Sequence, residues 1–195
     1  MGPVLLNLIG PPAVGKMTVG HEVAQRTGFR LLHNHMTIDL VLRFFDYGTP
    51  PFWRLVRSFR QQLFEEIAGS DLPGLITTFV WAFEDPTEEQ EIRRYTEPFK
   101  ARGLRVVFVE LQATQEERLR RNRTEFRLEH KPFRRDLELS DAQLIELDQR
   151  HQLSSNGAYD NDPDWLRIDN TDLRPDVVAE TIVERFGLSG RDVRF

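Results

Sequence analysis

One stretch near the N-terminus carries the strongest structural signal, and it reads Gly10, Pro11, Pro12, Ala13, Val14, Gly15, Lys16, Met17, Thr18. An almost continuous apolar run, from Val4 to Ile9, precedes it and is typical of a strand buried on both faces. A helical pattern follows from Lys16 to Arg26, with Gly28 placed to end the helix. The spacing G-x-x-x-x-G-K between a strand and a helix predicts a loop that binds phosphate groups.

The residue types of this loop fit that chemistry. Successive backbone N–H groups converge on phosphate oxygens, and the start of the following helix adds positive potential. We therefore expect Gly10 and Gly15 to allow the close approach and Lys16 to reach the terminal phosphates as a catalytic cation. The hydroxyl that usually follows the lysine and binds magnesium is replaced by Met17, and Thr18 comes one position later. The protein ligand of a metal ion therefore stays unknown, and a chance turn with a surface lysine is the alternative interpretation.

The remainder of the chain alternates between strand and helix patterns, without internal repeats. Strands are expected at Phe29–Leu32, Leu75–Phe83, Leu104–Leu111 and Trp165–Ile168. Helices are expected at Thr37–Phe45, from Pro50 to about Ile67, at Pro86–Arg102, from a capping Ser140 to about Leu153, and at Val177–Phe186. Such an alternation predicts an α/β fold with a parallel sheet that right-handed crossovers cover on both faces. No strand ends in a clear metal-binding aspartate, and Glu110 is the nearest candidate, or a plain salt-bridge partner.

Composition limits the classes of function. The 195 residues and 22.9 kDa fit a single domain, 1–195, and the lack of cysteine excludes a disulfide scaffold, a thiolate metal site and a cysteine nucleophile. No apolar run could span a bilayer and the first residues lack signal-peptide features, so we expect a cytoplasmic protein without a membrane partner. The net charge is −5, but residues 118–135 hold eight Lys or Arg against two Glu, a local +6 that leaves −11 elsewhere. This pattern argues against nucleic acid as a partner and favours contact with a compact anion.

Three stretches resemble the P-loop kinases of the nucleoside monophosphate kinase and shikimate or gluconate kinase group, which includes chloramphenicol phosphotransferase-like proteins. They are GPPAVGKMTVG (10–20), ERLRRNRTEFRLEHKP (117–132) and LRIDNTDLRPDVV (166–178). The second is similar to the lid that closes over ATP in those enzymes, and the third to their last strand and the loop beside the adenine. The resemblance covers nearly the whole chain. It implies a three-layer P-loop NTPase fold with a five-stranded parallel sheet, helices on both faces, a substrate-side helical region at about 36–72 and an arginine-rich lid at about 118–139.

The resemblance also implies the ligands and several site residues. ATP and Mg²⁺ are the expected cofactors. Arg121 and Arg127 are expected as catalytic cations against the triphosphate, with Arg123 beside them. A transferring phosphoryl group needs cations on its oxygens, and an arginine supplies two hydrogen bonds at once; a solvated basic helix face is the alternative. Asn170 and Thr171 are expected to bind the nucleotide.

The acceptor side departs from shikimate kinases, in which an Asp-x-Asp pair ends the second strand. The matching positions here are His33, Asn34 and His35. If the strand continues, both imidazoles point the same way, and we expect all three residues to hydrogen-bond the acceptor. Two histidines without a third ligand make a poor metal site, and capping of the strand end is the alternative. Asp39 is the candidate general base for a substrate hydroxyl, or a carboxylate that only stabilises a first helical turn.

A series of arginines lies on the helix that is expected to begin at Pro50. Arg54, Arg57 and Arg60 recur at intervals of three and could hold an anionic acceptor. We expect Arg57 to be the substrate contact, with a solvated helix face as the alternative. The apolar residues that recur along this helix are Phe52, Val56, Phe59, Leu63 and Ile67.

Together these features predict an ATP-dependent phosphotransferase that moves the terminal phosphate of ATP to a hydroxyl or phosphate of a small-molecule acceptor. A 5′-hydroxyl polynucleotide kinase would need a basic track outside the lid, which the −11 charge of the remaining residues opposes. A nucleotide-binding regulator with little turnover is a third hypothesis, supported by the missing hydroxyl after Lys16. The sequence leaves open whether the protein is a monomer or a homodimer.

Overall fold

The computed structural model describes residues 2–123 and 137–188. Its strands are β1 (Val4–Ile9), β2 (Arg30–His33), β3 (Gly74–Phe79), β4 (Val106–Gln112) and β5 (Trp165–Asp169). Its helices are α1 (Lys16–Thr27), α2 (Asn34–Leu42), α3 (Pro50–Ala68), α4 (Pro86–Lys100), α5 (Gln115–Asn122), α7 (Leu137–Arg150) and α8 (Pro175–Phe186). The predicted alternation of strands and helices is confirmed, while most of the expected lid lies outside the described residues.

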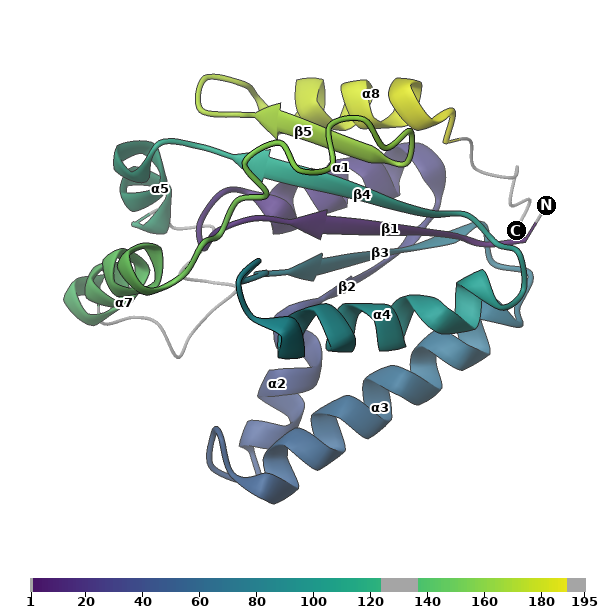
Figure 1. Ribbon diagram of the computed structural model, residues 1–195, viewed down its shortest axis with the longest axis horizontal. Helices are drawn as coiled ribbons and strands as arrows, with labels where there is room; N and C mark the ends of the chain where they lie inside the picture. Colours follow the sequence, from purple (N-terminus) through teal and green to yellow (C-terminus); the bar gives the residue numbers. More distant parts are fainter. Residues whose placement is uncertain (1, 124–136, 189–195) are drawn as a thin grey trace.

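The five strands form one sheet in the order β2-β3-β1-β4-β5, and every neighbouring pair is parallel. The apolar strand β1 lies at the centre, where Ile9 is paired with Phe79 on one side and Glu110 on the other. The carboxyl ends of all five strands therefore point to the same edge of the sheet, toward α5 and α7 (Figure 1). Residues that follow the strands are brought together at this edge, which is where ligands bind in open parallel sheets.

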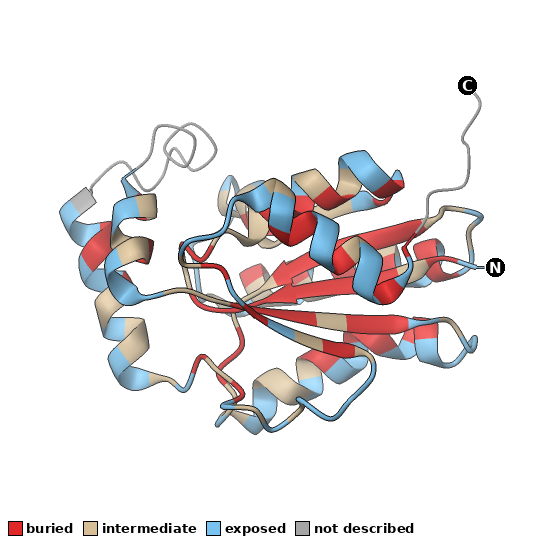
Figure 2. Cartoon of the chain, turned by 90° about the horizontal axis from the view of Figure 1, so that it is seen from above, coloured by how far each residue is buried: buried red, intermediate tan, exposed pale blue. Residues whose placement is uncertain are grey.

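Helices cover both faces of the sheet (Figure 1). On one face, α1 and α8 pack against each other over a core that includes Leu6, Leu8 and Ile182. On the other, α3 and α4 pack together over a second core that includes Leu5, Phe64 and Phe99. Most of the sheet is buried, while the helices present solvent-exposed outer faces (Figure 2). This is the predicted three-layer arrangement with a five-stranded parallel sheet.

Several element boundaries differ from those predicted, among them α2, which spans Asn34–Leu42 rather than Thr37–Phe45, and side-chain packing explains two of the differences. Strand β3 ends at Phe79 rather than Phe83. The apolar residues after it pack in an aromatic cluster instead: the rings of Trp81 and Phe83 stack with centroids 4.5 Å apart, and Trp165 lies 6.1 Å from Trp81. The apolar run therefore reflects burial of a loop rather than a continued strand.

The second difference concerns α7. Ser140 was expected to cap this helix, but α7 already begins at Leu137. The Ser140 hydroxyl instead accepts a hydrogen bond from the Asn122 amide of α5, at 3.0 Å. The serine that indicated a helix cap in the sequence therefore serves the tertiary contact between α5 and α7.

None of the helices within residues 2–123 and 137–188 combines the length and the apolar character that a membrane crossing requires.

Candidate active site

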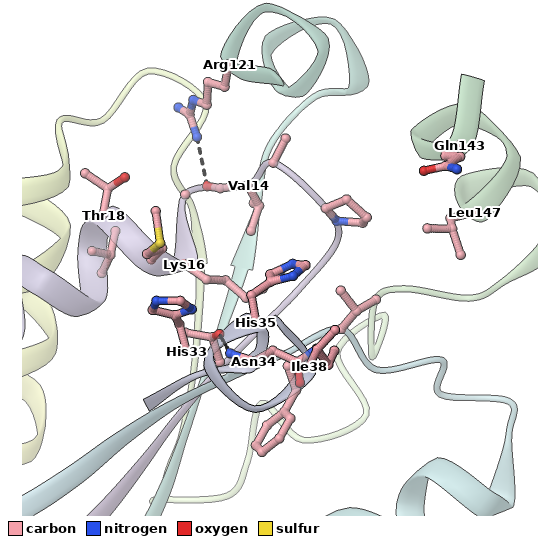
Figure 3. Close-up of a pocket in the computed structure, with 18 of the residues that line it drawn as sticks. Val14, Lys16, Thr18, His33, Asn34, His35, Ile38, Arg121, Gln143 and Leu147 are labelled. Carbon is pink, nitrogen blue, oxygen red and sulfur yellow. Dashed lines mark hydrogen bonds between the residues drawn. The ribbon is translucent and has the colours of Figure 1, made fainter. Parts of the chain in front are cut away.

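A pocket of about 1370 Å³ opens at the carboxyl edge of the sheet. One side is formed by the glycine-rich loop between β1 and α1, together with Arg121 and residues 170–175. The other side is formed by the end of β2, by α2, and by parts of α3 and α4. Gln143 and Leu147 of α7 lie across the pocket from the loop (Figure 3). The topology thus joins the predicted phosphate loop and the predicted acceptor residues in one cavity.

The loop between β1 and α1 has an unusual backbone. Three of its residues have positive φ angles: Gly10 (138°), Ala13 (62°) and Gly15 (105°). A Cβ atom on Gly10 would lie only 2.3 Å from the carbonyl oxygen of Leu111, so this position requires glycine. Ala13 is held in a left-handed conformation that costs a non-glycine residue free energy. Such conformations turn backbone N–H groups into one concavity, as anion-binding loops require.

Lys16 lies inside this loop at the start of α1. Its ammonium group donates hydrogen bonds to the carbonyl oxygens of Gly10 at 2.6 Å and Pro11 at 2.7 Å. Both carbonyls are neutral, and a phosphate oxygen is a stronger partner for an ammonium group. Residues 12–18 of the predicted loop border the pocket, while Gly10 and Pro11 do not. The Lys16 ammonium group therefore lies where a phosphate bound in the loop can replace these carbonyl oxygens as its partner.

Arg121 braces the loop from α5. Its guanidinium donates to the carbonyl oxygens of Val14 (2.9 Å), Asn170 (2.7 Å) and Thr171 (3.0 Å). The Asn170 side-chain amide donates to the same Val14 oxygen at 2.9 Å. Figure 3 shows the Arg121 side chain directed at Val14. Arg121, predicted as a catalytic cation, and Asn170 and Thr171, predicted to bind the nucleotide, thus all border the pocket. Arg121 and Asn170 also fix the shape of the loop.

Glu117 holds Arg121 in this position. Its carboxylate accepts a hydrogen bond from Arg121 Nε at 2.7 Å and two from Arg120, at 2.6 and 2.7 Å. The hydrogen bonds from Arg120, followed by those from Arg121, lower the pKa of Glu117 to about 2. The carboxylate therefore stays charged at every physiological pH and keeps the cation beside the loop.

The other predicted lid arginines have different positions. Arg123 forms an ion pair with Asp141 of α7, with Nη2 2.8 Å from the carboxylate, and does not border the pocket. Arg118 ties α5 to α7 through Asp148, with Nη1 at 3.0 Å. Arg127 lies outside the described residues. The ion pairs of Arg118 and Arg123 thus hold α5 against α7.

The His-Asn-His turn reaches the pocket in a form that differs from a continued strand. His33 ends β2 and Asn34 begins α2, so His35 lies in the first turn of a helix. The Asn34 backbone N–H donates to the Thr78 hydroxyl at 3.1 Å, which ties the turn to β3. His35 Nδ1 lies 3.7 Å from a carboxylate oxygen of Asp39, one helical turn later. All four residues His33, Asn34, His35 and Asp39 border the pocket. Figure 3 shows the first three on the side opposite Arg121.

Arg60, one of the three arginines that the sequence placed on this helix, is the buried one, although Arg57 was the predicted substrate contact. Only 8% of it is exposed, and it borders the pocket beneath the His-Asn-His turn. Its Nε donates to the Thr37 hydroxyl at 2.8 Å, and its Nη2 donates to the backbone oxygen of Asn34 at 3.0 Å and also to the Asn34 side-chain oxygen. Burial lowers the pKa of this guanidinium. Arg60 therefore holds the turn that carries both histidines.

A stricter use of helical periodicity would have found Arg60. The residues of α3 that are buried are Phe52, Val56, Arg60, Phe64, Ile67 and Ala68. Phe59, which the apolar pattern placed on this side, is 47% exposed. Arg60 continues the i, i+4 series of Phe52 and Val56. The prediction that Phe59 belongs to the buried face was therefore wrong, and the arginine takes that place.

Arg57, the predicted substrate contact, borders the pocket but has partners within α3 and α4. Its Nε lies 2.9 Å from a carboxylate oxygen of Glu91, and its guanidinium lies over the Trp53 ring, 5.7 Å from the centroid. Glu110, the weak candidate for a metal-binding carboxylate, does not border the pocket. It is fully buried and accepts hydrogen bonds from the Ser155 hydroxyl, the Ser155 N–H and the Ser154 hydroxyl. Its visible role is to hold the loop before β5.

Comparison with known proteins agrees with this architecture at the level of fold. No family model matches the chain, and no curated protein matches it. Among solved structures, it is similar to the Deinococcus radiodurans tunicamycin resistance protein (21% identity, TM-score 0.55, covering 97% of this chain and 98% of that one). It is also similar to shikimate kinase from Acinetobacter baumannii in complex with shikimate (16% identity, TM-score 0.58, 95% and 93% covered). A third similar structure is the Mycobacterium tuberculosis APS kinase with AMPPNP and APS (12% identity, TM-score 0.56, 95% and 98% covered).

These similarities extend over nearly the whole length of each chain. The protein therefore has the fold of the P-loop small-molecule kinases, and the resemblance predicted from its sequence is confirmed at that level.

Proposed function

We propose that the protein is an ATP-dependent phosphotransferase that moves the terminal phosphate of ATP to a hydroxyl group of a small molecule. The observation that carries this proposal is the shared pocket. A phosphate loop with an internal lysine faces a turn that presents His33, His35 and Asp39, and both border the same cavity of about 1370 Å³. A cavity of this size has room for a nucleotide and a small acceptor together, since sites for single drug-sized ligands span roughly 300–1000 Å³.

The loop fits the triphosphate of ATP. Its positive-φ residues turn N–H groups inward, and Gly10 leaves no room for a side chain. The hydrogen bonds of Lys16 to the neutral carbonyl oxygens of Gly10 and Pro11 can be exchanged for bonds to phosphate oxygens. Arg121 is already adjacent to the loop through Val14. In the proposed reaction Lys16 and Arg121 stabilise the negative charge that develops on the transferred group.

Mg²⁺ fits less directly. Within the described residues there is no group of three histidine or acidic side chains that could hold a metal ion. Mg²⁺ commonly keeps several waters and binds nucleotide phosphates with few protein ligands, and the Thr18 side chain borders the pocket at the loop. When bound there, the ion would neutralise phosphate charge.

The acceptor turn supplies the remaining chemistry. In the proposed step, His33 and His35 hydrogen-bond the acceptor, and the Asp39 carboxylate takes the proton of its hydroxyl group. The acceptor oxygen forms a bond to the terminal phosphorus while the bond to the bridging oxygen breaks, and ADP leaves with that electron pair. The position of His35 beside Asp39, at 3.7 Å, allows the imidazole to orient the carboxylate.

A screen of hydroxylated compounds by ADP release, with Lys16→Ala as the matched inactive variant, tests this proposal. At least one compound should stimulate ADP release by the parent, yield a phosphorylated product by mass spectrometry, and give neither signal with Lys16→Ala. Calorimetry should show ATP binding to the parent and a loss of at least about tenfold in affinity for the variant, since charge-assisted hydrogen bonds are the stronger class. Equal ATP affinity of the two proteins would contradict the role of the loop.

A further inference from the structure

The half of the pocket opposite the phosphate loop has a composition of its own. We call it the acceptor wall and define it by the pocket-lining side chains of Asp39, Tyr47, Trp53, Arg57, Arg60 and Glu91. These residues come from α2, α3, α4 and the turn before α3. What they present to the cavity decides which acceptor can bind there.

The two arginines of the acceptor wall are occupied by protein partners. Arg57 Nε is 2.9 Å from Glu91, and its guanidinium covers the Trp53 ring. The second carboxylate oxygen of Glu91 accepts a hydrogen bond from the Tyr95 hydroxyl at 3.0 Å. Arg60 spends its Nε and Nη2 donors on Thr37 and Asn34, as described above. Arg60 is buried and therefore serves to fix α2 onto α3. Arg57 is half-exposed, and the Glu91 carboxylate 2.9 Å from its Nε opposes its positive charge.

The acceptor wall as defined is formally neutral, and two further carboxylates that border the pocket, Asp85 and Glu88, make this half of the cavity negative. Its arginines, Arg57 and Arg60, stand against four carboxylates that border the cavity: Asp39, Asp85, Glu88 and Glu91. With the histidines neutral, this amounts to −2. An anionic acceptor would enter a region whose own charge repels it, and a bound ATP would add further negative charge nearby.

An aromatic surface accompanies this charge. Tyr47 borders the pocket with 64% of its surface exposed, and its ring meets the Trp53 ring edge-on at a centroid distance of 5.4 Å and an angle of 67°. Ile38 and Leu42 of α2 border the same region. An exposed ring backed by apolar side chains gains free energy when a flat apolar group covers it, and negative charge nearby favours a cation over the ring.

We infer that the acceptor is an uncharged or cationic hydroxyl compound that carries a planar apolar group, and that carboxylates and phosphate monoesters are disfavoured. This inference rests on the proposed function, because it specifies the second substrate of that reaction. It reverses the expectation from the sequence that the arginines of α3 hold an anionic acceptor. The reason is that the spacing of the arginines is visible in the sequence, while their partners on α2 and α4 are not.

Three probes of one shape test the inference: 2-(4-hydroxyphenyl)ethanol, tyramine and 4-hydroxyphenylacetate, which share a ring and differ in charge. Their binding is measured by calorimetry on the full chain saturated with a non-hydrolysable ATP analogue. Tyramine should bind at least about tenfold more tightly than the carboxylate, the scale set by unit charges a few ångströms apart in a solvent-exposed pocket, with the alcohol between them. Glu91→Gln should reduce this ratio, because it removes one carboxylate and releases Arg57.

A pair of aromatic variants tests the planar surface. Tyr47→Ala should weaken the alcohol probe severalfold, whereas Phe59→Ala should not, since Phe59 is 47% exposed but does not border the pocket. Tighter binding of the carboxylate, binding of none of the probes, or equal effects of the two variants would overturn the inference. Phosphoryl transfer is recorded separately by ADP release. If the binding order holds but no acceptor is phosphorylated, the charge preference is supported and the proposed function fails; if transfer occurs but prefers anionic acceptors, the function stands and the inference fails.

Discussion

The buried guanidinium of Arg60 offers the sharpest test of how the acceptor side is assembled. Arg60→Lys retains the positive charge but replaces the planar guanidinium, whose N–H donors point in several fixed directions, by an ammonium group with a single nitrogen. In the parent, Nε reaches Thr37 while Nη2 reaches both oxygens of Asn34. One ammonium nitrogen cannot occupy both positions, so at least one buried acceptor on α2 loses its partner.

The expected magnitude follows from these contacts. Hydrogen bonds to charged groups contribute about 1.5–3 kcal/mol each, and an acceptor left buried without a partner costs about 1–3 kcal/mol. Loss of one to two bonds, partly offset by water entry, gives a destabilisation of about 2–4 kcal/mol. For a chain of this size, 1 kcal/mol corresponds to about 2–4 °C, so Tm should fall by about 5–15 °C. Arg54→Lys, at an exposed position on the same helix, should change stability by less than about 0.5 kcal/mol.

Thermal and urea unfolding of the two variants measure this difference, and Thr37→Val isolates a single bond of the network. In the active protein, Arg60→Lys should also raise the acceptor KM several-fold while the Kd for ATP stays unchanged, because the turn that carries His33 and His35 loosens but the phosphate loop does not. Identical melting of Arg60→Lys and Arg54→Lys would refute the anchoring role. A parallel loss of ATP affinity would refute the separation of the two halves of the pocket.

Three other predictions concern the remaining pocket residues. Arg121→Ala should lower kcat by roughly 10²-fold, in the range seen for single donors to a developing charge, and because Val14 loses a brace the Kd for ATP should rise as well; unchanged rates in single-turnover assays would return this arginine to a purely structural role. His33→Ala and His35→Ala should each raise the acceptor KM with little effect on the Kd for ATP, and two-substrate kinetics beside thermal melts would contradict this if only Tm moved. Glu117→Gln should destabilise the protein by about 1 kcal/mol at neutral pH, after allowance for solvent screening. The pKa of Glu117 is about 2 in the folded protein against an ordinary value of 4.5, so the difference in stability from the parent should be full above about pH 4.5 and vanish as the pH falls through about 2. Urea unfolding at several pH values measures this difference.

The phosphate side of the site could be predicted from the sequence because its determinants are local. Gly10, Gly15 and Lys16 lie within seven consecutive positions, and backbone N–H groups do most of the binding that the motif encodes. The flanking strand β1 and helix α1 follow from apolar patterns that begin and end at the loop. The fold class and the succession of strands and helices along the chain follow from the same alternation, because parallel strands need crossover connections.

The acceptor side could not be predicted to the same depth, because its contacts join residues far apart in the sequence. Arg57 acquires its meaning from Glu91 on α4, and Arg60 from Asn34 and Thr37 on α2. A step of three residues rotates a side chain by about 300° around a helix, so arginines at 57 and 60 lie about 60° apart and meet different environments. The regular spacing of the arginines suggested one basic face, whereas packing divides them into an exposed, a half-buried and a buried residue.

The two halves of the pocket have formal charges of opposite sign. This difference bears on how one open cavity can hold two substrates, each on its own side. On the phosphate side Lys16, Arg120, Arg121 and Arg174 outnumber Glu117 and Asp172, and the start of α1 adds positive potential. On the other side Asp85 and Glu88, beside the formally neutral acceptor wall, make the formal charge negative. Under the proposed function, a polyanionic nucleotide is attracted to the loop and repelled from the acceptor wall, so it does not occupy the place of the second substrate. The fixed charges of different secondary-structure elements thus determine which substrate binds on which side of the pocket, and the acceptor wall does not need to recognise ATP. On this proposal the terminal phosphate lies on the Lys16 side and the acceptor hydroxyl lies beside Asp39, its proposed base, so that transfer takes place between the two regions.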